Sequence, residues 1–132
     1  NKKERLVGKP KYAAPELIRG EVKKQNRTTD IYSIGILLFQ LTCGFLPFEG
    51  NIKEVMQMQL KDDVPIAHIS DPALRNIVRQ ATEKKQEKRF QSASEFRVAL
   101  DTMPQPKSKS ALLFIVFAAV LGIILGICLA LL

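Results

Sequence analysis

The chain has 132 residues and carries 20 Lys and Arg against 13 Asp and Glu, a formal net charge of +7. All of these charges lie in residues 1–110, and residues 111–132 carry none. This division excludes a simple water-soluble globule, a collagen, a disulfide framework and a disordered acidic tail. Since the sequence begins with Asn1 rather than Met, we expect it to be a piece of a longer protein.

The first 27 residues are polar and basic and show little helical periodicity. Pro15 interrupts a short semi-apolar stretch at residues 12–18, and a proline there suits a loop or the first turn of a helix. Residues 21–27 are uniformly polar, so we expect an exposed loop.

The densest apolar run before the tail spans residues 31–43, IYSIGILLFQLTC. Thr28 or Thr29 can cap a helix that starts here, and Asp30 suits the positive end of its dipole. Gly44 is a natural C-terminal stop. Such a helix is apolar nearly all round but too short to cross a bilayer, so we expect it to be the central buried helix of a domain.

Three further helices are predicted from their N-terminal signals. Residues 51–54 resemble a capping box with Asn in place of Ser and predict a helix over roughly 51–60. Asp71 followed by Pro72 predicts the start of an amphipathic helix, and residues 92–95 form a strict capping box for another. Because no stretch is typical of a β-strand, the predicted fold is mostly α.

The tail follows a short linker at residues 103–110. Residues 111–132 form 22 uncharged positions, which as a helix extend about 33 Å and span a bilayer core of roughly 30 Å. We expect a single transmembrane helix, either a tail anchor or a span followed by more chain. Because Lys107 and Lys109 precede it, the positive-inside rule predicts a single-pass membrane protein with residues 1–110 in the cytoplasm.

Small residues recur at four-residue spacing within this predicted span. Gly122 and Gly126 form a Gly-x-x-x-Gly motif, which Ala118 and Ala130 extend in both directions. Such a stripe lets two helices approach closely and would support a homodimer. Because Gly and Ala are common in membrane helices, chance occurrence is the competing interpretation.

Four short motifs occur along the chain, and their combination in this order is a specific signal. They are GKPKYAAPE at residues 8–16, DIYSIG at 30–35, GFLPF at 44–48 and KRFQSA at 88–93. Residues 1–102 therefore resemble the second half of the large lobe of a serine/threonine protein kinase, and the last motif is similar to bacterial receptor-type kinases. The resemblance implies a partial kinase domain of helices, joined by the linker to the membrane helix.

The resemblance assigns structural roles to four residues. Glu16 would form a buried ion pair with Arg89, Asp30 would hold the catalytic loop through its backbone, and Gly35 would let another segment pack closely against the central helix. The residues alone leave ordinary alternatives open, with Asp30 as a helix cap and Arg89 as a surface cation.

The resemblance also implies a substrate-binding segment that includes Gly8, Lys9, Pro10 and Tyr12. Residues 8–14 would receive the substrate residue that follows the phosphorylated one. Here the chain departs from the family, because Lys9 stands where Thr is usual. This lysine could pair with the catalytic Asp, favour an acidic substrate, or mark a kinase that has lost activity.

The sequence lacks the motifs that perform phosphoryl transfer. It has no Gly-x-Gly-x-x-Gly, no His-Arg-Asp and no Asp-Phe-Gly. The resemblance implies ATP and Mg²⁺ as cofactors of a parent kinase acting on protein substrates, whereas this chain alone is expected to bind neither, and no metal or nucleic acid. Two alternatives to an enzyme fragment stay open: a membrane-anchored pseudokinase scaffold, and a single-span protein whose helical domain mimics the pattern.

Overall fold

The computed structural model describes residues 9–104, which contain helices and no strand, as predicted. The five α-helices are α1 (Pro15–Ile18), α2 (Arg27–Cys43), α3 (Ile52–Lys61), α4 (Pro72–Ala81) and α5 (Ala93–Asp101). The same residues also form short turns of 3₁₀ helix, of which the first precedes α1 and the others lie in connections between helices: η1 (Pro10–Tyr12), η2 (Val22–Lys24), η3 (Ile66–His68) and η4 (Gln86–Lys88).

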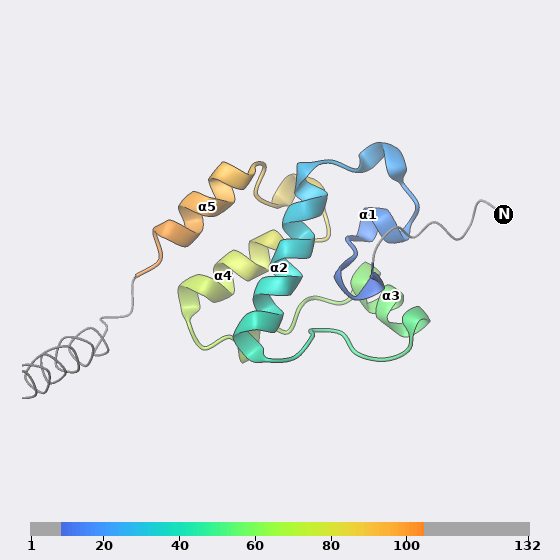
Figure 1. The fold of residues 1–132 in the computed structure, drawn as a ribbon, viewed down its shortest axis with the longest axis horizontal. Coiled ribbons are helices and arrows are strands. Elements are labelled where there is room, and N and C mark those ends of the chain that lie inside the picture. Colours follow the sequence, from blue (N-terminus) through green and yellow to red (C-terminus); the bar gives the residue numbers. More distant parts are fainter. Residues whose placement is uncertain (1–8, 105–132) are drawn as a thin grey trace, which may run out of the picture.

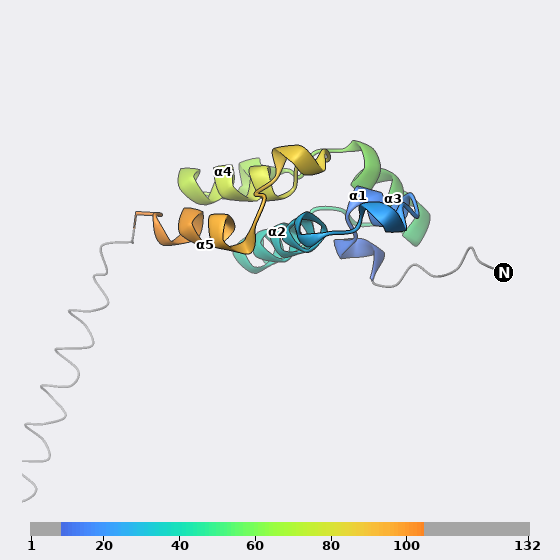
Figure 2. The same ribbon diagram turned by 90° about the horizontal axis from the view of Figure 1, so that it is seen from above.

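Helix α2 lies in the middle of the molecule, with α4 and α5 on one side and α1 and α3 on the other (Figure 1). Seen from above, α4 lies over the layer that contains α2 and α5 (Figure 2). Two apolar clusters fill the space between these helices. The first surrounds Tyr32, Ile36 and Phe39 of α2, and the second joins Ile31 to Phe96 of α5.

Helix α2 begins at Arg27, earlier than the apolar run indicates, because Asn26 caps it. The Asn26 side chain accepts a hydrogen bond from the Thr28 amide at 2.8 Å, and Thr29 Oγ1 accepts one from the Asn26 amide at 3.2 Å. The prediction that Thr28 or Thr29 is the cap is therefore wrong. An Asn satisfies the first helical amides as well as a Thr does, and the polar first turn concealed the true start.

Helix α2 has a buried face, as expected of the central helix, but the described residues do not cover all of its apolar surface. Tyr32, which faces the core, is fully buried. On another face, Ile34, Leu37 and Leu41 are 47%, 43% and 75% exposed. One apolar face of the central helix therefore has no partner within residues 9–104.

The predicted capping boxes of α3 and α5 are present, with one difference. In α3, the Asn51 and Glu54 side chains accept from each other's backbone amides at 3.0 and 2.9 Å. In α5, Ser92 Oγ accepts from the Glu95 amide at 3.0 Å, but the Glu95 carboxylate accepts from the Gln91 amide at 2.7 Å. The strict reciprocal box predicted for α5 is wrong in that half, because the carboxylate reaches one residue further back.

Within residues 9–104, no helix has both the length and the apolar character needed to cross a bilayer. The predicted membrane helix at 111–132, with its Gly122 and Gly126 spacing, lies outside the described residues. It stays a prediction, as do its orientation and the pairing of two copies.

Candidate functional site

The candidate site is built on η1 and the extended residues around it. Gly8 lies outside the described residues. Lys9 precedes the turn with an exposed side chain, and its carbonyl accepts a hydrogen bond from the Tyr12 amide at 3.0 Å. Pro10 occupies the first position of the turn, where its fixed φ suits helical geometry and its missing N–H is not needed. The exposed Lys9 side chain is free to meet a ligand at this surface.

Contacts from two helices hold η1 in place. The Tyr12 hydroxyl donates to Gln40 Oε1 of α2 at 2.6 Å, and Ser33 Oγ of α2 donates to the Tyr12 carbonyl at 2.9 Å. From α3, Gln59 Nε2 donates to the Lys11 carbonyl at 2.8 Å. The backbone of the candidate substrate segment is thus fixed on α2 and α3, while the Lys9 and Lys11 side chains remain exposed.

The structure brings Glu16 and Arg89 together across 73 positions of the sequence. The guanidinium donates to both carboxylate oxygens, at 2.8 and 3.0 Å. Both residues are buried, at 2% and 1% exposure. Thr29 Oγ1 and Gln86 Nε2 also donate to the carboxylate, at 2.9 and 3.0 Å. Burial raises the pKa of Glu16, but the hydrogen bonds from Arg89, the backbone and Thr29, together with the Arg89 charge, outweigh it and hold the pKa below its ordinary value.

Arg89 is an interior cation rather than a surface one. Its remaining donors bond to the backbone carbonyls of Glu83 at 2.7 Å, Thr28 at 3.0 Å and Lys84 at 3.2 Å. Its guanidinium also lies 4.9 Å from the centre of the Tyr32 ring, within cation–π range. The pair therefore ties α1, the start of α2 and the loop before α5 into one buried network.

Gly35 and Asp30, to which the resemblance gives structural roles, both lie on α2. A Cβ at Gly35 would lie 2.8 Å from Thr82 Cγ2 and 2.9 Å from Ala81 Cβ, so the end of α4 packs on the bare backbone there. Asp30 is exposed in the first turn of α2, and Asn26 rather than Asp30 is the cap. The catalytic loop that Asp30 would hold is not among the motifs of this chain.

A partly buried lysine next to this network has no counterpart in the sequence predictions. Lys84 Nζ donates to Tyr32 Oη at 3.1 Å and to the Gln59 carbonyl at 3.0 Å. Burial lowers the pKa of Lys84 to about 8, although the charges of Asp63 and Asp62 oppose this. Burial also raises the pKa of Tyr32. In the sequence, Lys84 belongs to a run of charged residues that is typical of a surface turn, so no sequence signal distinguishes it from its neighbours.

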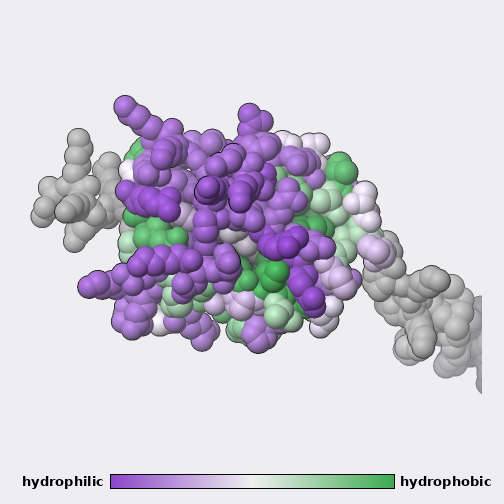
Figure 3. Space-filling model, turned by 180° about the vertical axis from the view of Figure 1, so that it is seen from behind, coloured by the Kyte–Doolittle hydropathy of each residue, from purple (hydrophilic) through white to green (hydrophobic). Residues whose placement is uncertain are grey.

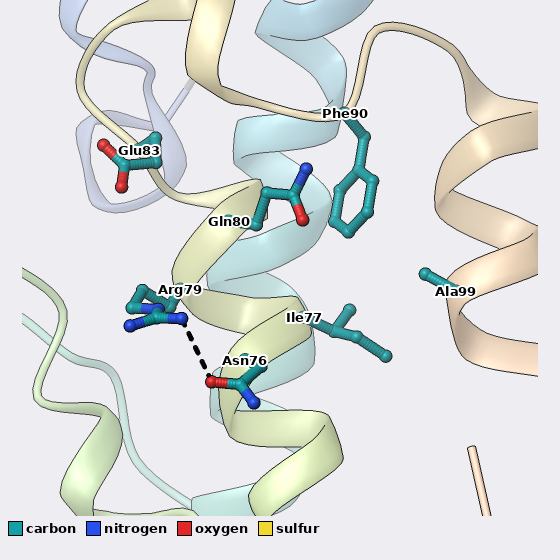
Figure 4. Close-up of a pocket in the computed structure, with 7 residues that line it drawn as sticks. All are labelled: Asn76, Ile77, Arg79, Gln80, Glu83, Phe90 and Ala99. Atoms are coloured by element: carbon teal, nitrogen blue, oxygen red, sulfur yellow. Dashed lines mark hydrogen bonds between the residues drawn. The ribbon is translucent and has the colours of Figure 1, made fainter. Parts of the chain in front are cut away.

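A second surface feature is a hollow between α4 and α5. Ile77, Phe90 and Ala99 face one another across it, whereas Arg79 and Glu83 point away (Figure 4). The molecular face in Figure 3 is largely hydrophilic, with apolar areas separated by polar ones. No cluster of three metal-ligating side chains occurs in residues 9–104. We therefore keep the η1 segment as the candidate site.

Comparison with known proteins gives one family match and a bacterial relative. A family model described as "Protein kinase domain" matches residues 1–101. The serine/threonine-protein kinase Pkn1 of Myxococcus xanthus is 34% identical over 100 residues. That alignment covers 72% of this chain and 14% of the relative, so the chain spans only a small part of the relative's length.

Proposed function

Because this chain belongs to the protein kinase family, we propose that it forms the second half of the large lobe of a serine/threonine protein kinase. The intact kinase transfers the γ-phosphoryl group of ATP to hydroxyl groups of protein substrates. The similar bacterial protein is named a serine/threonine-protein kinase, which supports the choice of serine and threonine as acceptors.

The observation that carries this proposal is the buried Glu16–Arg89 pair, which joins α1 to the loop before α5. Glu16 follows the candidate substrate segment by only a few residues, and Arg89 comes from the far end of the domain. A buried two-point ion pair allows little freedom of position, because displacement leaves two charges unsatisfied in the interior. The pair therefore fixes α1, which follows the segment from Lys9 to Tyr12 on which a protein substrate would rest. The segment itself is held by its hydrogen bonds to α2 and α3.

In this proposal, Gly8, Lys9, Pro10 and Tyr12 receive the substrate chain. Pro10 and the hydrogen-bonded Tyr12 shape the backbone, and Lys9 places a positive charge at the exposed edge. A positive charge at this place favours acidic side chains in the substrate next to the acceptor hydroxyl.

ATP and Mg²⁺ do not fit the residues of this chain, which lack the phosphate-binding and metal-binding motifs of kinases. We assign them to the rest of the intact kinase. The uncovered face of α2 supports this division, because Ile34, Leu37 and Leu41 form an apolar surface that another part of the same lobe would bury. Asp30, exposed at the start of the helix, would then contact the catalytic loop.

We also propose a membrane anchor at residues 111–132, with residues 1–110 in the cytoplasm. The uncharged run and the lysines at 107 and 109 support it. Deletion of residues 111–132 is expected to move the protein to the soluble fraction of a cell lysate. Retention in the membrane fraction would contradict the anchor.

The activity is tested by phosphate transfer from labelled ATP to acidic and basic protein substrates, with Mg²⁺ present and then chelated. The intact wild-type protein is expected to label a substrate only with Mg²⁺. Tyr12→Phe, which removes only the hydroxyl bonded to Gln40, is expected to raise KM for the protein substrate and leave KM for ATP unchanged. Absence of transfer from a folded wild-type protein would overturn the kinase proposal.

A pseudokinase scaffold is the second candidate, and Lys9 is the observation that favours it. A lysine has no acceptor and is larger than the usual Thr, so it cannot replace that hydroxyl next to a catalytic Asp. If Lys9 is a lesion, Lys9→Thr is expected to raise phosphate transfer. Equal or lower transfer by this variant would show that Lys9 belongs to a working site.

A further inference from the structure

Lys84 lies where three parts of the fold meet. It follows α4, and its ammonium group bonds to the hydroxyl of Tyr32 on α2 and to the main chain of Gln59 on α3. It also lies 5.1 Å from the centre of the Phe48 ring and 5.5 Å from that of Tyr32. Neither the ion pair nor the substrate segment requires a lysine here.

In the series of hydrogen bonds that starts at Lys84, each group donates to the next. An ammonium group can only donate, so Tyr32 Oη accepts from it. The single hydroxyl proton of Tyr32 then goes to Gln59 Oε1. With its oxygen occupied, the Gln59 amide presents its NH₂ group to the Lys11 carbonyl in η1, at 2.8 Å. The reverse amide orientation would place two carbonyl oxygens against each other.

We propose that Lys84 is a positioning residue for the substrate segment, acting through Tyr32 and Gln59 on the Lys11 carbonyl. That η1 receives a substrate rests on the proposed function, whereas the action of Lys84 on η1 does not. The charged donor at one end of the relay sets the orientation of the amide at the other, and this orientation holds η1 against α3. Each group in the relay polarises the next, which strengthens the last bond.

A purely structural role would give a different outcome from the positioning role. Burial of the Lys84 charge lowers its pKa, so the charge itself does not favour folding. A methionine is about as long as the lysine and can keep its contact with the Phe48 and Tyr32 rings without the cost of desolvating a charge. Lys84→Met is therefore expected to retain global stability while loosening η1.

The test is amide hydrogen exchange in the intact protein, followed by mass spectrometry of the peptide covering residues 10–14. This peptide contains the Tyr12 and Ala13 amides that close η1. In Lys84→Met, its exchange is expected to rise about fivefold, the effect of losing one ordinary hydrogen bond. Exchange in α5 is expected to stay unchanged. The control is Lys85→Met, which removes the same charge from an exposed neighbour.

The path through Gln59 is tested by a double-mutant cycle. Gln59→Glu keeps an acceptor for Tyr32 but removes the NH₂ donor to Lys11. If Lys84 acts through that donor, Lys84→Met adds nothing to the exchange of η1 in the Gln59→Glu background. Additive effects, or an effect no larger than that of Lys85→Met, would overturn the proposal.

Two conservative variants keep the test decisive if Lys84→Met fails to fold. Lys84→Arg keeps a group that can only donate and is expected to preserve η1 protection, whereas Lys84→Gln can also accept and is expected to lose it. Equal protection in both folded variants would refute the directional relay. In phosphate-transfer assays, Lys84→Gln is expected to raise KM for the protein substrate severalfold without changing KM for ATP. An inactive wild type would refute the kinase function, while the exchange result would still decide the role of Lys84.

Discussion

Removing either partner of the Glu16–Arg89 pair is expected to destabilise the domain strongly. Glu16→Ala takes away the two hydrogen bonds of 2.8 and 3.0 Å from the guanidinium and leaves Arg89 only 1% exposed without its carboxylate partner. Three backbone carbonyls still bond to Arg89, but none carries a compensating charge. A buried charge left without its partner typically costs about 3–5 kcal/mol of unfolding free energy, and we expect a loss in this range.

Urea unfolding of Glu16→Ala, Arg89→Ala and the double variant measures this loss, with far-ultraviolet circular dichroism as the signal. Since the double variant leaves no charge unpaired, it is expected to lose far less than the sum of the single variants. Arg97 and Asp101 are a matched control, because their 3.4 Å pair is exposed at 81% and 68%. Arg97→Ala is expected to change stability by less than about 1 kcal/mol. Additive single effects, or single effects as small as the control, would refute the reasoning.

Four further predictions follow from particular contacts. Gly35→Ala is expected to destabilise the domain in thermal unfolding, because overpacking against α4 costs about 1–3 kcal/mol and outweighs the gain in helix propensity; unchanged stability would contradict the close contact. Asn26→Ala is expected to cost about 1 kcal/mol by removing the cap of α2, measured by urea unfolding against Asn26→Asp. Since the Glu16 pKa is held below its ordinary 4.5, the stability difference between wild type and Arg89→Met is expected to shrink as the pH falls below about 4.5. The Lys84 pKa of about 8 lies below its ordinary 10.5, so the unfolded chain binds more protons between these pH values. The wild type is therefore expected to gain stability relative to Lys84→Met as the pH rises from 8 to 10, and a constant difference would contradict the lowered pKa.

The helices could be predicted from sequence because their signals are local. Asn51, Asp71 and Ser92 each cap the helix that follows, and each acts within four residues of its own position. The start of α2 was predicted too late because its first turn is polar and the apolar pattern begins only at Ile31. Periodicity reports the buried face of a helix, not its first hydrogen bond.

Long-range contacts were predictable only where the family resemblance supplied them. Neither Glu16 nor Arg89 carries a local sign of burial, and the resemblance alone paired them. Lys84 lies in the same kind of charged run as Lys85, which is exposed, yet Lys84 is partly buried and its ammonium group bonds to the Gln59 carbonyl. Which of two adjacent lysines turns inward depends on the position of Tyr32 and Gln59, and those positions exist only in the folded chain.

The polar residues inside the apolar run of α2 show how the helix serves the candidate site. Ser33 and Gln40 are seven positions apart, so two helical turns place them on one face, and both bond to Tyr12 of η1. Tyr32 bonds to Gln59, which holds the other side of the same segment. If the run served only to fill a core, these polar positions would be replaceable by apolar ones. Ser33→Ala and Gln40→Leu are instead expected to loosen η1 in hydrogen exchange while leaving α4 and α5 protected, and unchanged exchange in η1 would show that the helix only fills the core.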